Sequence, residues 1–476
     1  MRILHATAEA LPFAKTGGLA DVLGALPAAQ SALGHGVCVV HPWYPALAAA
    51  RAPLWIGDVD VPFDGGLERV GVGTLELGTV RYAFVGHRAF RREALYGYPD
   101  DTYRFALFAR AVPAVAARIG FTPDVVHGHD WHAALLPALL RFAGHLPPGF
   151  AGLPSVLTVH NAQYQGWADA ADVVAWGRLP GHLASPLALN GRGNLLHAGL
   201  VTADHVTTVS PTYARELLDP AVAYGLDPAF AALGPRLTGI LNGLDVEAFD
   251  PQRDLALAAR FGPDDLAGKR RCKEALADEM GLSPARPLLG VVSRLADQKG
   301  LDLLLAAVPE VLEQGWNLVL LGSGDPKLEA LAQGAFALHP DRIAGHLGYD
   351  DALARRIYAG VDALAVPSRF EPCGLAQLIA MRYGTLPVAR ATGGLVDTID
   401  DGRTGFLFAA AERSALTAAL ARARASYDDA ALWRRMQVAA MSENFDWSRS
   451  AQAYDDLYRV LAGRTTPTEP TTGAPP

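Results

Sequence analysis

The chain has 476 residues, of which 50% are hydrophobic and 19% are charged, and its formal net charge is −8. This length exceeds what one ordinary hydrophobic core supports, so two domains are expected. The acidic balance and the lack of a basic run argue against nucleic acid as a partner. No apolar run reaches the roughly 18 residues that cross a membrane, so no membrane partner is expected either.

The three cysteines, Cys38, Cys272 and Cys373, have neither paired nor CxxC spacing. This usage is typical of a reducing compartment and not of a disulfide framework or a structural zinc site. His5 and Glu9 interrupt the apolar start of the chain, which therefore indicates a first strand and not a secretory signal. We expect a cytoplasmic protein.

The first half of the chain predicts an α/β domain. A strand over 2–6 precedes a glycine-containing loop at 15–18 and a helix whose apolar residues recur at helical spacing from Leu19 to Ala29. Alternation with glycines over 55–85 predicts antiparallel strands. The other expected elements are strands at 37–40, 123–127, 156–159 and 205–209 and a helix at 100–119.

Asp58 and Asp60 have the DxD spacing that some metal-dependent transferases use. Val59, Val61 and Phe63 alternate with the two aspartates along the predicted strand. Because strand side chains alternate between faces, both carboxylates are expected on the solvated face and not in a metal site.

Polar side chains gather where predicted strands of the first half end. His127, His129, Asp130 and His132 fall within six residues, which allows a metal site. No matching ligand group occurs elsewhere, so a polar rim at the carboxyl end of the strand is favoured. His160 follows the next strand in the same way, although a single histidine is more often structural than catalytic.

The second half repeats the alternation of strands and helices after a charged connector at 251–287 that is expected to be helical. The expected strands lie at 288–292, 318–321, 343–346, 363–366 and 386–389, and the expected helices at 301–312, 328–338, 350–359 and 447–461. Two successive βαβ halves predict two Rossmann-like domains.

The turn at 367–374 joins a strand to a helix and is expected to bind an anionic, sugar-like ligand. The backbone N–H groups of Cys373, Gly374 and Leu375 open the helix, which suits a phosphate. Glu371 lies just outside these donors and can accept hydrogen bonds from ligand hydroxyls. The alternative is that Glu371 and Pro372 only start a helix.

Two further turns of the second half support an anionic ligand. Arg294 and Lys299 follow the strand at 288–292, where cations can clamp a diphosphate, although a solvated surface is the alternative. The Thr-Gly-Gly at 392–394 offers backbone donors. The Gly-x-Gly at 322–324 lacks the rest of the dinucleotide fingerprint and no Walker A sequence occurs, so neither nicotinamide chemistry nor phosphoryl transfer is indicated.

These residues carry a resemblance to a known family. The motifs are Lys15-Thr16-Gly17-Gly18-Leu19-Ala20-Asp21-Val22, His129-Asp130-Trp131-His132, His160-Asn161, Arg294 with Lys299, Ser368 to Leu375, and Thr392-Gly393-Gly394. From residue 1 to about residue 461 the chain resembles the bacterial glycogen synthases, which use ADP-glucose and share their family with the starch synthases. The first motif is strongly diagnostic of that family.

The resemblance implies an α/β protein of the GT-B fold, with two Rossmann-like domains that face an interdomain cleft. The implied parts are an acceptor-side domain at 1–246, a nucleotide-sugar-binding domain at 247–445, a helix at 446–462 that crosses back to the first domain, and a disordered tail at 463–476.

The resemblance also implies transfer of glucose from ADP-glucose to the non-reducing end of an α-1,4-glucan such as glycogen, with retention at the anomeric carbon and release of ADP. It implies that no metal or other cofactor takes part. Two alternatives stay open: a GT-B glucosyltransferase that uses UDP-glucose or another acceptor, and a catalytically silent glucan-binding protein. The oligomeric state is open.

The implied catalytic residues are Glu371, His160, Arg294, Lys299 and Lys15. In the family pattern Arg294 and Lys299 neutralise the leaving diphosphate, Glu371 holds the glucose hydroxyls, and the main chain of His160 faces the anomeric centre. The implied substrate-binding residues are Lys15, Gly18, Asp21, Asp130, Asn161, Tyr164, Asn242, Tyr349, Cys373, Gly374, Leu375, Thr392 and Gly393, with Tyr349 stacking on adenine.

Two positions depart from the family pattern. Thr7 stands where some members carry cysteine, and His197 stands where lysine is common. The second difference removes a fixed positive charge from the acceptor-side domain.

Overall fold

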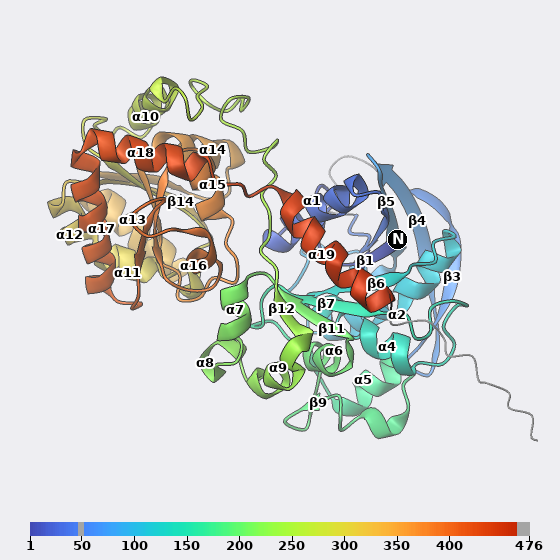
Figure 1. The fold of residues 1–476 in the computed structure, drawn as a ribbon. Helices are drawn as coiled ribbons and strands as arrows, with labels where there is room; N and C mark the ends of the chain where they lie inside the picture. Colours follow the sequence, from blue (N-terminus) through green and yellow to red (C-terminus); the bar gives the residue numbers. More distant parts are fainter. Residues whose placement is uncertain (46–51, 464–476) are drawn as a thin grey trace, which may run out of the picture. The chain divides into compact units, whose positions relative to one another are not determined.

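The computed structural model describes residues 1–45 and 52–463 (Figure 1). The chain divides into two compact units. Unit 1 contains Met1–Val209, Ala214–Gly243 and the described residues from Trp447 onward. Unit 2 contains Ser210–Tyr213 and Leu244–Asp446. The tail expected to be disordered lies, apart from Gly463, outside the described residues.

A mixed β-sheet forms the middle of unit 1, with the strand order β12-β11-β7-β6-β1-β2-β5-β4-β3. The strands are β1 (Arg2–Ala6), β2 (Gly36–Pro42), β3 (Leu54–Phe63), β4 (Gly66–Leu77), β5 (Val80–Gly86), β6 (Val125–His129), β7 (Ser155–Val159), β11 (His205–Thr208) and β12 (Leu237–Gly239). Neighbours from β12 to β5 are parallel, whereas β3, β4 and β5 pair antiparallel. The antiparallel strands predicted over 55–85 are therefore confirmed.

Two helices from opposite ends of the chain cover one face of this sheet. They are α1 (Gly18–Ala32) and α19 (Trp447–Ala462), which lie side by side in Figure 1 and pack together. Leu23 of α1 and Leu461 of α19 belong to one apolar cluster with Ile3 of β1 and Val125 of β6. The last helix therefore completes the core around the first strand.

The remaining elements of unit 1 surround the sheet. The helices are α2 (Asp101–Arg118), α3 (Asp130–Ala133), α4 (Leu136–Phe142), α5 (Ala170–Gly177), α6 (Leu195–Thr202), α8 (Pro220–Ala223) and α9 (Asp227–Leu233), while α7 (Pro211–Glu216) includes residues of both units. A small sheet is formed by β8 (Trp167–Ala168), β10 (Arg192–Asn194) and β9 (Ala188–Leu189).

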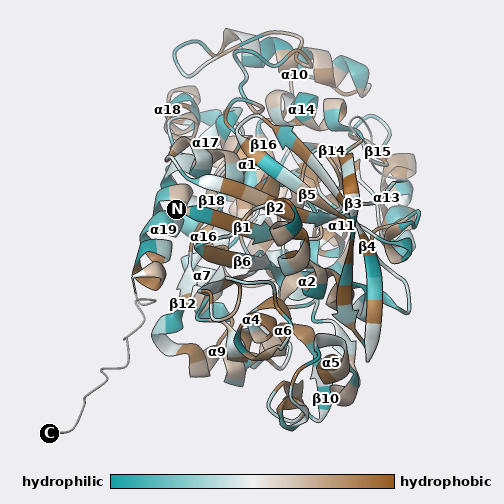
Figure 2. Ribbon diagram, turned by 90° about the vertical axis from the view of Figure 1, so that its right-hand side faces the viewer, coloured by the Kyte–Doolittle hydropathy of each residue, from teal (hydrophilic) through white to brown (hydrophobic). Residues whose placement is uncertain are grey.

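Unit 2 is built on a parallel sheet with the strand order β15-β14-β13-β16-β17-β18. The strands are β13 (Leu288–Val292), β14 (Asn317–Gly322), β15 (Ile343–Leu347), β16 (Ala363–Val366), β17 (Leu386–Arg390) and β18 (Phe406–Phe408). The strand β14 is buried along its whole length, and Figure 2 shows the hydrophobic colour on it. Parallel strands covered on both faces have this continuous apolar pattern.

The helices of unit 2 lie on both faces of its sheet. They are α10 (Ala267–Glu279), α11 (Leu301–Ala306), α12 (Val308–Glu313), α13 (Pro326–Leu338), α14 (Asp351–Gly360), α15 (Ala376–Arg382), α16 (Gly394–Thr398), α17 (Arg413–Asp428) and α18 (Ala430–Met441). Leu276 of α10 and Ile357 of α14 pack with Val319, whereas Leu304 of α11 and Leu420 of α17 share a cluster with the adjacent strand residue Leu318. Adjacent strand residues point to opposite faces, so these two groups of helices cover opposite faces.

Two predicted helices differ from the structure. The helix predicted over 301–312 is divided at Ala307 into α11 and α12, because Pro309 in the first turn of α12 has no N–H to continue α11. The connector predicted as helical over 251–287 is helical only in α10. Before α10 the side chains of Asp250 and Asp254 accept hydrogen bonds from backbone N–H groups two residues onward, and such local bonds favour turns.

The DxD pair lies on the solvated side of β3, as predicted. Asp58 and Asp60 are exposed while Val61 and Phe63 are buried, and Asp60 pairs with Arg69 of the next strand. Within the described ranges, no helix is both long enough and apolar enough to span a membrane.

Candidate functional site

The glycine-containing loop of unit 1 is anchored by Glu9. One carboxylate oxygen of Glu9 accepts hydrogen bonds from the backbone N–H groups of Thr16 at 2.5 Å and Gly17 at 3.2 Å. The other accepts from the hydroxyls of Thr16 at 2.7 Å and Tyr96 at 2.8 Å. Glu9 is only 4% exposed, so a buried charge-assisted network fixes the loop between β1 and α1.

The predicted ligand-binding residues Lys15, Gly18 and Asp21 lie on this loop and on the first turn of α1. Lys15 Nζ lies 2.7 Å from a carboxylate oxygen of Asp21, and the Lys15 side chain is 38% exposed. Gly18 is exposed at the first position of the helix. The structure therefore brings these three residues together, with a cation accessible to solvent.

Asp130 holds the main chain that follows β7. The residue begins α3 with a φ of 54°, and Oδ1 accepts hydrogen bonds from the backbone N–H of His160 at 2.7 Å and of Asn161 at 3.3 Å. Burial raises the pKa of Asp130 to about 7 against the opposing effect of these two hydrogen bonds. The ends of β6 and β7 are thus joined at the predicted site residues.

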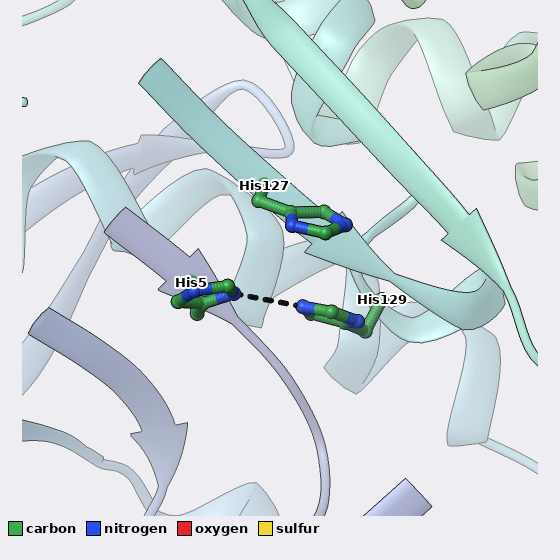
Figure 3. Close-up of side chains that lie close together, drawn as sticks. All are labelled: His5, His127 and His129. Atoms are coloured by element: carbon green, nitrogen blue, oxygen red, sulfur yellow. Dashed lines mark hydrogen bonds between the residues drawn. The ribbon is translucent and has the colours of Figure 1, made fainter. Parts of the chain in front are cut away.

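The histidines of the predicted polar rim separate into two groups. His127 and His129 belong to β6, which extends two residues beyond the prediction, and they lie with His5 of β1 in one buried cluster (Figure 3). His132 lies apart from that cluster and stacks on Tyr96. The grouping follows from parallel pairing, which sets His5 opposite His127.

One ring nitrogen from each of His5, His127 and His129 lies within 4.8 Å of the others, a spacing that a metal ion could use. Both nitrogens of each ring, however, already lie within 3.1 Å of another side chain. A metal would have to displace these hydrogen bonds in a site with no carboxylate. The donor set therefore favours a hydrogen-bonded cluster.

The central pair of unit 2 is Lys299 and Glu371. Lys299 Nζ lies 2.5 Å from Oε2 of Glu371, which also accepts a hydrogen bond from Ser368 Oγ at 2.9 Å. The side chains are 20% and 7% exposed. The turn after β13 and the turn after β16 are thus joined by a largely buried ion pair.

Backbone contacts fix the same two turns. Gly300 has a φ of 63°, and a Cβ there would lie 2.1 Å from the carbonyl oxygen of Pro367. Arg369 donates its backbone N–H to Gln298 at 2.8 Å and forms two hydrogen bonds with Asp302 at 2.8 and 2.6 Å. Only glycine allows so close an approach of the two turns.

The turn after β17 packs on the end of the Glu371 turn. Gly394 donates its N–H to the carbonyl of Glu371 at 3.1 Å, and Gly393 has a φ of 46°. Gln377 Nε2 donates to the carbonyls of Cys373 at 2.9 Å and Gly374 at 3.0 Å. The predicted residues Thr392, Gly393, Cys373, Gly374 and Leu375 therefore lie on two turns in contact.

Several predicted binding residues project into solvent. Tyr349, after β15, is 80% exposed and Tyr164 is 50% exposed, while Asn242 is half-buried. Arg294 is exposed, and no acidic residue in the described part of the chain pairs with it. An accessible guanidinium beside the Lys299 turn can receive an anionic ligand.

Sequence reasoning did not identify Glu9, Gln30 or Tyr458, which hold the predicted residues in place, and it named Ser368 only as the first residue of a motif. The partners of Gln30 and Tyr458 lie up to 428 residues away along the sequence, and no spacing motif encodes such contacts. The departure at His197 is partly buried, where its Nδ1 lies 3.3 Å from the carbonyl of Leu187 and burial lowers its pKa.

The chain matches two protein families and a solved structure. The family described as "Starch synthase catalytic domain" matches residues 2–232, and the family described as "Glycosyl transferases group 1" matches residues 286–425. The catalytic domain of starch synthase IV from Arabidopsis thaliana, solved with ADP and acarbose bound, has a TM-score of 0.90 and 34% identity, covering 97% of this chain and 99% of that one. The chain is thus a glycosyltransferase of the GT-B fold.

Relatives with assigned functions narrow the class. A glycogen synthase of Deinococcus deserti is 48% identical and one of Deinococcus radiodurans is 46% identical, each over 97% of this chain and 100% of the relative. The chain belongs to the family of bacterial glycogen synthases and starch synthases.

Replacement of Glu9 by glutamine should loosen the glycine-containing loop. A carboxamide offers one accepting oxygen where the carboxylate offers two, so one pair of hydrogen bonds to Thr16, Gly17 and Tyr96 is lost. We expect amide hydrogen exchange of the peptide covering this loop to rise about tenfold, because about 1.4 kcal/mol of local stability is lost.

The matched control is Glu76→Gln on β4, which loses only a surface pair with Arg81. Exchange–mass spectrometry should show no change in the loop for that variant. Equal exchange of the loop in wild type and Glu9→Gln would contradict the anchoring role of Glu9.

Unit 1 should lose stability in mild acid. Burial lowers the pKa of His5 to about 4, of His41 and His160 to about 3, and the pKa of His127, His129 and His132 well below 6.5. These rings stay neutral when folded but bind protons in the unfolded chain, so stability falls as pH drops from 6.5 to about 4. For His5 the loss is about 2 kcal/mol at pH 5 relative to pH 7.5, the other five rings act in the same direction, and Asp130 opposes this with one proton.

Calorimetry between pH 7.5 and pH 5 tests this expectation. His41 contacts the rings of Phe13, Tyr44 and Phe84, so His41→Phe removes one titrating group in a site that accepts a ring. The variant should lose less stability than wild type over the same interval. A transition temperature independent of pH would show that these histidines are not buried in the neutral form.

Proposed function

We propose that the protein is a glycogen synthase that transfers glucose from ADP-glucose to the non-reducing end of an α-1,4-glucan and releases ADP. The observation that carries this proposal is the Lys299–Glu371 pair at the strand ends of unit 2, with the unpaired Arg294 in the same turn as Lys299. A protein that only bound glucan would not need this concentration of cations beside a carboxylate.

In unit 2, Arg294 and Lys299 neutralise the diphosphate of the donor in the role that a metal ion has in other transferases. Lys299 is held by Glu371 before the donor binds, so its ammonium group is already positioned. Glu371 accepts hydrogen bonds from the glucose hydroxyls, while Cys373, Gly374 and Leu375 present backbone groups to sugar and phosphate. The exposed ring of Tyr349 stacks on adenine.

In unit 1, Asp130 fixes the peptide of His160, and the main-chain carbonyl of His160 stabilises positive charge at the anomeric carbon. Lys15, Gly18 and Asp21 contribute to the diphosphate and donor sugar. Asn161, Tyr164 and Asn242 bind sugar and acceptor hydroxyls.

The reaction that these groups support needs no protein nucleophile. The acceptor 4-hydroxyl oxygen forms a bond to the anomeric carbon while the bond from that carbon to the ADP phosphate oxygen breaks. The proton of the acceptor hydroxyl passes to that phosphate oxygen on the same face, which gives retention. Arg294 and Lys299 stabilise the negative charge that develops on the leaving phosphate.

The proposal includes two further elements. Transfer proceeds without a metal, because the cations of unit 2 supply the neutralising charge. The reaction takes place in the cytoplasm, in agreement with three free, buried cysteines among the described residues. The alternative is a transferase of the same fold that uses UDP-glucose. Recognition of the nucleotide base by the region around Tyr349 decides between the two donors.

Donor choice tests the proposal directly. We expect incorporation of labelled glucose into glycogen from ADP-glucose to exceed incorporation from UDP-glucose, and to persist in EDTA. Preference for UDP-glucose would assign the protein to the alternative transferase class. Absence of transfer from either donor would contradict the synthase function, and loss of transfer in EDTA would contradict the metal-free clamp.

Replacement of Arg294 by alanine should lower kcat by at least about 100-fold, because a cation that stabilises the leaving group in the transition state is lost. Arg294 is exposed and lacks an ion-pair partner among the described residues, so the thermal unfolding temperature should not change. The matched control is Arg286→Ala. Arg286 is also exposed and lies just before β13, whereas Arg294 lies just after that strand. Near-normal turnover in Arg294→Ala would remove this residue from the mechanism.

A further inference from the structure

The buried polar side chains under α1 and α19 lie on one face of the unit 1 sheet. Ile3 packs against both helices, and His5 follows two residues later on the same face of β1. Parallel pairing continues this face across the sheet, with His5 opposite His127, His129 opposite Thr158, and Thr158 opposite Thr207. A row of polar groups thus crosses four strands where apolar residues would be expected.

The first half of the row joins His160 to helix α1. Nε2 of His160 lies 3.1 Å from Nδ1 of His129, and Nε2 of His129 lies 3.0 Å from Nδ1 of His5. Figure 3 shows the His5–His129 bond. Nε2 of His5 then lies 2.7 Å from Oε1 of Gln30, a fully buried residue of α1.

The second half joins α1 to helix α19 and returns to the sheet. Gln30 Nε2 donates to the hydroxyl of Tyr458 at 3.3 Å, and that hydroxyl lies 2.6 Å from Nδ1 of His127. Nε2 of His127 lies 2.6 Å from Thr158 Oγ1, which lies 2.6 Å from Thr207 Oγ1. Seven hydrogen bonds in succession therefore connect His160 to Thr207.

The carboxamide of Gln30 sets the donor and acceptor of each hydrogen bond between Gln30 and His160. Its oxygen can only accept, so His5 carries its proton on Nε2. A neutral imidazole has one donor and one acceptor, so His5 Nδ1 accepts from His129 Nε2–H, and His129 Nδ1 accepts from His160 Nε2–H. Burial lowers the pKa of all three rings, which keeps them neutral.

The hydroxyl of Tyr458 ties the orientation of the Gln30 carboxamide to the tautomer of His127. The Gln30 nitrogen must donate, and the Tyr458 oxygen accepts that bond while its own proton goes to His127 Nδ1. Turning the carboxamide by 180° would reverse every bond from Gln30 to His160 together. A turned carboxamide would accept from Tyr458, so the bonds from Tyr458 to Thr158 would have to reverse as well. The hydroxyl of Tyr458 therefore couples the tautomer of His160, across three intervening side chains, to the proton positions of His127 and Thr158.

We propose that Tyr458 of the C-terminal helix is a positioning residue for His160, acting through Gln30, His5 and His129. Tyr458 keeps the His160 ring protonated on Nε2, with Nδ1 free to accept a hydrogen bond. It thereby also helps to position the His160 peptide, whose N–H donates to Asp130. The inference rests on the proposed function in that His160 borders the transferred sugar. The packing of α19 against the sheet therefore sets the state of the His160 ring in unit 1.

The test removes the Tyr458 hydroxyl and keeps the ring. In Tyr458→Phe the Gln30 nitrogen loses its acceptor and the carboxamide can turn, so both tautomers of His5, His129 and His160 become populated. NMR of the full chain labelled with ¹⁵N-histidine should show Nε2–H alone for these three residues in wild type and both forms in the variant. With ADP-glucose and glycogen, kcat should fall about fivefold while KM for the donor stays unchanged.

Tyr454→Phe is the matched control, since this tyrosine lies one turn earlier on α19, is equally buried, and has its hydroxyl 3.5 Å from Thr158. It should retain the wild-type tautomers and kcat. Gln30→Leu interrupts the chain from α1 and should reproduce the effect of Tyr458→Phe, which covers the case that the tyrosine variant does not fold.

The two readouts separate the inference from the proposed function. A mixture of tautomers in wild type, or a single unchanged tautomer of His160 in Tyr458→Phe, would overturn the inference even if glucose is transferred. Equal kcat values for Tyr458→Phe and Tyr454→Phe would overturn the positioning role. If no donor supports transfer, the proposed function fails, and the tautomer pattern alone then decides whether the hydrogen-bonded chain is directed as described.

Discussion

The ion pair between Lys299 and Glu371 is the interaction on which the site of unit 2 depends. It joins the turns after β13 and β16, each of which must leave its strand and start a new helix within a few residues. A buried carboxylate without its cation would carry a large desolvation cost, so each partner fixes the other. Gly300 and Gly393 allow the turns to approach closely enough for this pair and its neighbours to form.

Buried polar groups in unit 1 also need partners, but in the row of histidines these groups are neutral. β1 and β6 carry histidines in place of apolar residues near their carboxyl ends, and both ring nitrogens of His5, His127 and His129 have a hydrogen-bond partner. Such a network favours one arrangement of protons, because each bond determines the next.

The sequence predicted the strands β1 and β13 to the residue, because short apolar runs bounded by turn residues are typical of buried strands. It also indicated the turns that carry Arg294, Lys299 and Glu371. It did not predict the break at Pro309, where one helix becomes two, or the turns made by Asp250 and Asp254. Gln30 and Tyr458 could not be found either, since a polar residue on an amphipathic helix indicates a solvated face until the partner across the core is known.

We propose above all that transfer from ADP-glucose proceeds with retention and without a metal on the residues described. The most direct measurement is ¹³C NMR of the reaction of ADP-glucose labelled at the anomeric carbon with a maltooligosaccharide in EDTA. We expect an α-1,4-linked product and one ADP released for each glucose added. A β-linked product, release of free glucose in place of transfer, or a requirement for added metal would contradict the account.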